Sequence, residues 1–158
     1  MEHGLGDRAT PLDARPGDTL ALTMADVEDL LRLQNRFMIG FDLALGTGAL
    51  LAPGATLSAL GHAQPDPATR DLFRRCGPIW LTFAAAHTVA ERRGEPRDWW
   101  ALAWLRGTEI LTDAVWSLSP GFTRPGARPG LWFAGASNLA MALGFGRLGQ
   151  SRPRRRRR

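Results

Sequence analysis

Three ionisable residues, Arg106, Glu109 and Asp113, interrupt an otherwise apolar stretch of the sequence. Spacings of three and four residues place side chains along one face of a helix, so the three share a face if this stretch is helical. Ionisable groups inside a membrane span cost roughly 2.5 to 3.5 kcal/mol each, so they normally face the bundle interior and pair. The spacing therefore predicts a polar cluster in the interior of a helical bundle.

Other apolar stretches contribute three more polar residues, Asp42, His87 and Asn138. If the stretches alternate in direction, Asp42 and His87 lie toward the same end as Arg106, and Asn138 lies at mid-depth. One interpretation is structural, with Arg106 neutralised by Asp42 or by the Glu109 carboxylate. Under it, the cluster only sets helix packing.

The other interpretation is a functional pocket. Glu109 and Asp113 would then supply acid catalysis, His87 would be a base, and Asp42, Arg106 and Asn138 would bind the ligand. Asp113 has no evident cation at its depth unless Arg74 or Arg75 reaches inward. Of the three ionisable residues in this stretch, Asp113 is therefore the one whose burial most needs a functional explanation.

Motifs for other chemistries are weak. One histidine among scattered carboxylates lacks metal-ligand spacing, so no metal site is predicted. Gly46-Thr47-Gly48 is too short for a phosphate-binding fingerprint, and Cys76, the only cysteine, has no disulfide partner. The motifs leave open both which cofactor, if any, the chain uses and whether it is an enzyme.

The hydropathy pattern predicts an all-α fold, a four-helix transmembrane bundle in up-down topology. The expected spans are residues 37–60, 76–90, 99–118 and 130–146, with Pro53 ending or kinking the first and a polar loop over 61–70. Thr23 is the expected N-cap of the first helix. The membrane domain covers 23–148, between a disordered N-terminal segment, 1–22, and a disordered Arg-rich tail, 149–158.

Two features favour the membrane over a soluble bundle. Tryptophans gather near the ends of the expected spans, as in an interfacial belt. Small residues recur every four positions in the first and fourth spans, where they would let helix backbones approach closely. They are Gly40, Ala44, Gly48 and Ala52, and Gly130, Ala134, Asn138, Ala142 and Gly146. The mean hydropathy of −0.17 argues for the soluble alternative.

Arginine supplies all 20 basic residues, and six of these lie in the last eight positions. The other fourteen face fifteen acidic residues, so the body of the chain is close to neutral. The arginine distribution places both termini in the cytoplasm, with the protein in a bacterial inner membrane. The expected partners are the lipid bilayer, anionic lipids at Arg154, Arg155, Arg156, Arg157 and Arg158, and a membrane protein or a second copy, but not nucleic acid.

Three stretches of the sequence resemble a known family of proteins. They are LLAPGATLSALG from residue 50, LFRRCGPIWLTFAAAH from residue 72 and LAWLRGTEILTDAVW from residue 102. Over roughly residues 36–148 the chain resembles small four-helix bacterial membrane proteins of the DoxX-like and DUF4345-like type. The resemblance implies a membrane bundle with buried charges in its third helix. Some members are linked to quinone-dependent oxidation and others are accessory subunits.

Two functional hypotheses follow. The first is an accessory or structural inner-membrane protein whose opposite charges pair. The alternative is a membrane-embedded enzyme acting on a lipophilic substrate, a quinone or an isoprenoid, through a buried carboxylate.

Overall fold

The computed structural model of the chain describes residues 23–63, 65–121 and 124–150. The segment 1–22 and residues 151–158 of the tail, both predicted to be disordered, lie outside this part. All regular secondary structure in the described part is helical, which confirms the prediction of an all-α fold. The helices are α1 (Met24–Leu51), α2 (Pro53–Ala59), α3 (Pro67–Arg74), α4 (Gly77–Arg93), α5 (Pro96–Ser117) and α6 (Ala127–Gln150).

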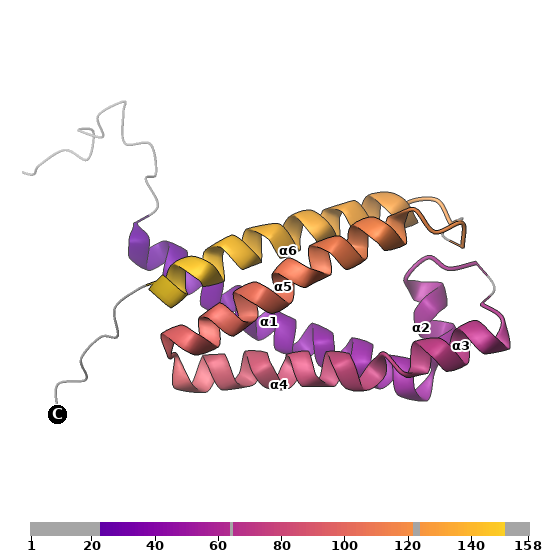
Figure 1. Cartoon of the computed structure of the whole chain (residues 1–158), viewed down its shortest axis with the longest axis horizontal. Helices are drawn as coiled ribbons and strands as arrows, with labels where there is room; N and C mark the ends of the chain where they lie inside the picture. Colours follow the sequence, from indigo (N-terminus) through magenta and orange to yellow (C-terminus); the bar gives the residue numbers. More distant parts are fainter. Residues whose placement is uncertain (1–22, 64, 122–123, 151–158) are drawn as a thin grey trace, which may run out of the picture.

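Four long helices, α1, α4, α5 and α6, alternate in direction along the bundle (Figure 1). The start of α1, the turn between α4 and α5 and the end of α6 lie at one end, which we call the terminal end. The short helices α2 and α3 and the connection between α5 and α6 lie at the other, which we call the α2/α3 end. Within the described residues, no helix is both long enough and apolar enough to be a membrane span by mean hydropathy.

Local sequence signals explain where α1 and α2 begin. Thr23 is the N-cap of α1, as predicted, and forms a capping box with Asp26: each side chain accepts a hydrogen bond from the other residue's backbone N–H. Hydrogen bonds from the hydroxyl and the backbone N–H of Thr23 lower the pKa of Asp26. Pro53, which lacks a backbone donor, opens α2, so the predicted segment 37–60 is two helices.

Part of the predicted loop 61–70 is instead the start of α3. Asp66 caps this helix by accepting hydrogen bonds from the Thr69 backbone N–H and hydroxyl at 2.9 and 2.7 Å, and these bonds lower the pKa of Asp66. Pro67 occupies the first turn, where its missing donor has no cost. The Asp-Pro pair thus starts a helix where the sequence analysis placed a break.

The long helices pack as two pairs, α1 along α4 and α5 along α6. The backbones of α1 and α4 approach closely at Gly46 and Gly77, where a Cβ on either residue would lie 2.9 Å from the other's carbonyl oxygen. The sequence analysis predicted a close approach at the small residues that begin with Gly40 and Ala44, which lie on a different face of α1. A Cβ on Gly40 would meet nothing from another helix within 4 Å, and Ala44 is exposed.

Apolar core residues gather in two clusters. The larger one lies on α1, α4, α5 and α6 and comprises Met38, Ala90, Trp99, Leu102, Ala103, Met141 and Phe145. The smaller one joins α1 to α2 and α3 and comprises Ala49, Leu57 and Phe73. Trp99, expected at an interface, is instead buried, with its ring stacked on Phe145 at 5.6 Å.

Candidate functional site

The helix α5 turns Arg106 and Asp113 into the bundle and leaves Glu109 between them only partly buried. Arg106 is 2% exposed, which is exceptional for a guanidinium and requires partners inside the protein. The face shared by the three residues is thus directed toward the other helices, as the spacing had suggested. They do not share one set of contacts, however.

Arg106 joins three helices through its guanidinium. Its Nη2 donates to Oδ2 of Asp42 on α1. Its Nε donates to Nε2 of His87 on α4 over 3.0 Å, and Nη2 lies 2.6 Å from the same nitrogen. The guanidinium also lies over the Phe83 ring, 5.7 Å from its centroid. A single side chain therefore ties α5 to α1 and α4, at a place where Asp42 is 0% exposed.

These contacts define the protonation state of His87. An arginine has only donors, so His87 Nε2 must accept and carries no proton. The proton of the neutral ring is then on Nδ1, which lies 2.6 Å from Oδ1 of Asn35. Both ring nitrogens of His87 are therefore engaged. Nε2 of His87 also lies 3.8 Å from Oδ2 of Asp42, but because the ring is neutral this contact is not a salt bridge.

Asn35 on α1, a residue that the sequence analysis did not select, completes this arrangement. Its Oδ1 accepts from His87, and its Nδ2 donates to the His87 backbone carbonyl at 3.2 Å and to Oε2 of Glu91 at 3.1 Å. Glu91 in turn pairs with the exposed Arg36 at 2.6 Å. A hydrogen-bonded series thus runs from the surface through Glu91, Asn35 and His87 to Arg106.

Helical periodicity was the signal that would have found Asn35 and Glu91. Asn35 precedes Asp42 by seven residues, two turns of one helix, and Glu91 follows His87 by four. Asn35 lies in the polar first half of α1 and Glu91 in the polar last turn of α4, where one more polar residue is inconspicuous. We call Asn35, Asp42, His87, Glu91 and Arg106 the polar network.

Asp113 forms a separate contact. Its Oδ2 accepts a hydrogen bond of 2.9 Å from Nδ2 of Asn138 on α6, and both residues are buried. The backbone of α6 comes close at Gly135, where a Cβ would lie 3.6 Å from that of Asp113. Arg74 does not reach inward to this carboxylate, because it bonds to the Leu50 carbonyl and to Asp71. Asn138, grouped with His87 in the sequence analysis, belongs with Asp113.

Glu109 makes no hydrogen bond or salt bridge with any residue in the described part of the chain. Its carboxylate interacts electrostatically with Arg106, Asp113 and Asp42, and also with the thiol of Cys76. One cation thus serves three carboxylates. Of these, Glu109 is the one open to proton exchange or to a further partner. A second open acceptor is Oδ1 of Asp42, which is buried and has no hydrogen-bond partner among the described residues.

A cavity of about 630 Å³ lies at the α2/α3 end, and no member of the polar network lines it. Its walls come from α2, α3, the start of α4 and the second half of α5, and they include the rings of Phe73, Trp80 and Trp116. The proposed catalytic residues His87, Glu109 and Asp113 are not among its lining residues. Cys76 does line the cavity, and its thiol interacts electrostatically with Glu109.

The described residues hold no cluster of three or more His, Cys, Asp or Glu side chains suited to a metal ion. The polar network is instead a hydrogen-bonded structure with one open carboxylate nearby. No family model matches the chain, and no curated protein or solved structure is significantly similar to it.

Proposed function

We propose that the chain is an integral membrane protein whose long helices lie in a lipid bilayer and are held together by the polar network. The observation that carries this proposal is the distribution of side chains. Every long helix exposes large apolar side chains on its outer surface, where a soluble bundle carries polar ones. They include Phe37, Phe41 and Leu43 on α1, Ile79 and Val89 on α4, Trp104, Leu111 and Val115 on α5, and Trp132, Phe133, Leu139 and Leu143 on α6.

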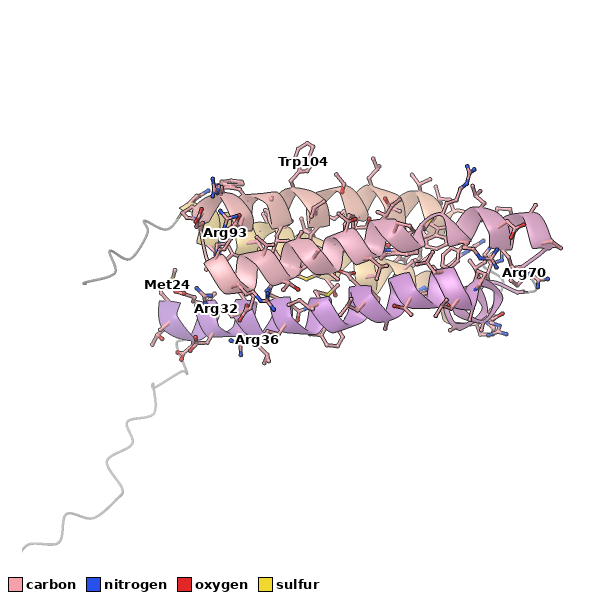
Figure 2. All side chains as sticks on the ribbon, turned by 90° about the horizontal axis from the view of Figure 1, so that it is seen from below. Met24, Arg32, Arg36, Arg70, Arg93 and Trp104 are labelled. Atoms are coloured by element: carbon pink, nitrogen blue, oxygen red, sulfur yellow. The ribbon has the colours of Figure 1, made fainter. Side chains whose placement is uncertain are left out.

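Charged residues in the same segments avoid that surface. Within 37–51, 77–90, 99–117 and 130–146 they are Asp42, Arg106, Glu109 and Asp113; three are buried and Glu109 is partly buried. Figure 2 shows the labelled arginines toward the two ends of the bundle, whereas Trp104, 75% exposed, projects from its side. The inward charges lower the mean hydropathy of α1 and α5 without placing charge on the outer surface.

Helix length supports the same proposal. At about 1.5 Å per residue, the 22 residues of α5 and the 24 of α6 give lengths of about 33 and 36 Å, close to a hydrocarbon core of about 30 Å. Because apolar side chains face outward on all four long helices, one protein partner would not cover them all. Lipid, which surrounds a bundle, would.

The proposed location is a bacterial inner membrane with both termini in the cytoplasm. The terminal end carries Arg32, Arg36, Arg92, Arg93, Arg97 and Arg147, and the six arginines of 151–158 follow in sequence. The α2/α3 end carries five arginines, namely Arg70, Arg74, Arg75, Arg124 and Arg128. Positive residues favour the cytoplasmic side, and the terminal arginines are suited to anionic lipid head groups there.

The role that the contacts support best is structural or accessory. Arg106 is satisfied by direct contacts with Asp42 and His87, and a closed ion pair of this kind needs no substrate. An enzyme acting on a lipophilic substrate is the second candidate, favoured by the apolar cavity. In that case Glu109 is the best-placed acid, because His87 has both ring nitrogens engaged and Asp113 is bonded to Asn138.

Extraction of membranes tests the proposal. Cells expressing the full chain are lysed, and the membrane fraction is washed at alkaline pH, which strips peripheral proteins. We expect the chain to remain in the membrane pellet. A variant with Leu139→Arg and Leu143→Arg on the outer face of α6 should be lost from the pellet, whereas the control Arg97→Gln at the terminal end should stay. A folded, monodisperse chain in the wash would overturn the proposal.

A further inference from the structure

The cavity at the α2/α3 end has the size of a ligand site. Its volume of about 630 Å³ falls within the roughly 300 to 1,000 Å³ of small-molecule pockets. No member of the polar network lines the cavity, so the network does not account for it. It therefore requires its own explanation.

The side chains that line the cavity indicate which class of ligand it would bind. The described residues that line the cavity include no aspartate, glutamate or arginine, and His62 and Cys76 are their only ionisable side chains. The wall therefore offers a charged ligand few groups that could neutralise it. Three aromatic rings form one part of the wall, with Phe73 5.4 Å from Trp80 and 6.4 Å from Trp116 between centroids. The cavity's hydroxyls are already engaged: those of Thr69 and Thr112 donate to Asp66 and to the Thr108 carbonyl, and that of Ser119 accepts from the Gly121 N–H. An uncharged, largely apolar molecule fits these walls.

The cavity opens toward the side of the bundle. Leu72 on α3 and Leu111 and Val115 on α5 line it, and they are also 67%, 68% and 62% exposed. These residues continue the outward apolar surface of the long helices. A ligand would thus pass between α3 and α5 from the hydrocarbon phase without crossing a charged surface.

We propose that this cavity binds an uncharged lipophilic molecule, of the size of an isoprenoid or fatty alcohol, that enters sideways from the bilayer. The proposal rests on the proposed membrane location. Glu109 interacts electrostatically with Cys76 on the cavity wall but does not itself line the cavity.

Cys76 gives a reporter for the test, because it is the only cysteine of the chain and is partly exposed in the cavity wall. The full chain is reconstituted into phosphatidylcholine nanodiscs, and alkylation of Cys76 by N-ethylmaleimide is followed by intact mass spectrometry. The probes are farnesol, which is uncharged, and farnesyl phosphate, its charged counterpart. Farnesol should slow alkylation saturably, by about tenfold at ten times the half-saturating level, and farnesyl phosphate by less than about twofold.

Two variants place the effect in the cavity. Val115→Trp fills the opening on α5 and should abolish protection by farnesol, whereas Val89→Trp, the same change at an exposed valine outside the cavity, should retain it. Leu72→Trp on the opposite wall serves if Val115→Trp does not fold, as judged by circular dichroism.

Three results would overturn the proposal. They are no protection of the wild type, equal protection of Val115→Trp or Leu72→Trp, and stronger protection by farnesyl phosphate. The last would indicate a head group held by the arginines of α3. If protection fails while the chain still resists the alkaline wash, the membrane proposal stands and only the ligand proposal falls.

Discussion

The guanidinium of Arg106 donates a hydrogen bond from Nε to Nε2 of His87 over 3.0 Å, and this contact determines the charge of the His87 ring. Because arginine only donates, His87 must accept and is neutral. Among the described residues, Arg106 is then the only cation facing Asp42, Glu109 and Asp113. The stability of the bundle should therefore depend strongly on Arg106 and unequally on the three acids.

Removing the Arg106 charge should be severely destabilising. Arg106→Met leaves Asp42 as a buried, uncompensated carboxylate, a change that typically costs about 3 to 5 kcal/mol. The measurement is the free energy of unfolding in mixed micelles titrated with dodecyl sulfate. Arg97→Met, at an exposed arginine on the same helix, is the matched control and should change stability by no more than about 0.5 kcal/mol.

The double variant Arg106→Met, Asp42→Leu should recover much of that loss, because it removes both members of the pair. Additive losses in the two single variants and the double variant would show that the two side chains do not act as a pair.

Asn35 should fix the tautomer of His87. In the wild type, ¹⁵N NMR of the ring should show a proton on Nδ1 and none on Nε2, with His87→Gln identifying the signals. Asn35→Leu removes the acceptor and leaves the Nδ1 proton buried without a partner, at a cost of about 1 to 3 kcal/mol. A proton on Nε2 in the wild type would contradict the donor assignment of Arg106.

Glu109 and Asp113, two carboxylates of α5, should respond differently to neutral substitution. Glu109→Gln should change the free energy of unfolding by no more than about 0.5 kcal/mol, since Glu109 has no hydrogen bond to lose among the described residues. Asp113→Ala should cost about 1 to 3 kcal/mol, because Nδ2 of Asn138 then stays buried without an acceptor. The comparison uses the same micelle titration, and a reversed order would contradict the assigned contacts.

The capping box at the start of α1 should fail in acid. Hydrogen bonds from Thr23 lower the pKa of Asp26 from its ordinary value of 3.8. The stabilisation by this carboxylate is therefore complete above the unfolded pKa and is lost as pH falls through the lower folded pKa. Hydrogen exchange at the first-turn amides should accelerate, relative to the intrinsic rate, below about pH 4 in the wild type. In Asp26→Asn the relative exchange rate should not change over this range, and an equal change there would refute the assignment.

The sequence was informative about the elements of this fold and about some of the polar network. Apolar runs separated by Pro- and Gly-bearing breaks located the long helices, and the Arg106 spacing indicated an inward face. Asp42 and His87 were identified because a polar residue in an apolar run is conspicuous. Asn35 and Glu91 were not, because polar neighbours such as Arg36 and Arg92 surround them in sequence, and only packing distinguishes the inward side chain.

Helix-helix contacts were the part that spacing alone did not determine. Small residues at Gly40 and Ala44 suggested one packing face, yet α1 turns Asn35, Met38, Asp42, Gly46 and Ala49 toward its neighbours. The inward direction of Asp42 decides between the faces, since an outward carboxylate would lie on the apolar surface. Similarly, Asn138 lies with Asp113 because α6 packs along α5, a pairing that the order of helices does not dictate.

Spin-label accessibility tests the central claim most directly, namely that lipid covers the apolar outer surface around a polar interior. In a Cys76→Ser background, a nitroxide is placed singly at Phe41, Leu139 and Arg97, and the protein is reconstituted into phosphatidylcholine vesicles. Molecular oxygen concentrates in hydrocarbon, and a nickel chelate stays in water. We predict that oxygen relaxes the label more than the chelate at Phe41 and Leu139, and less at Arg97. Stronger relaxation by the chelate at all three positions would contradict the account.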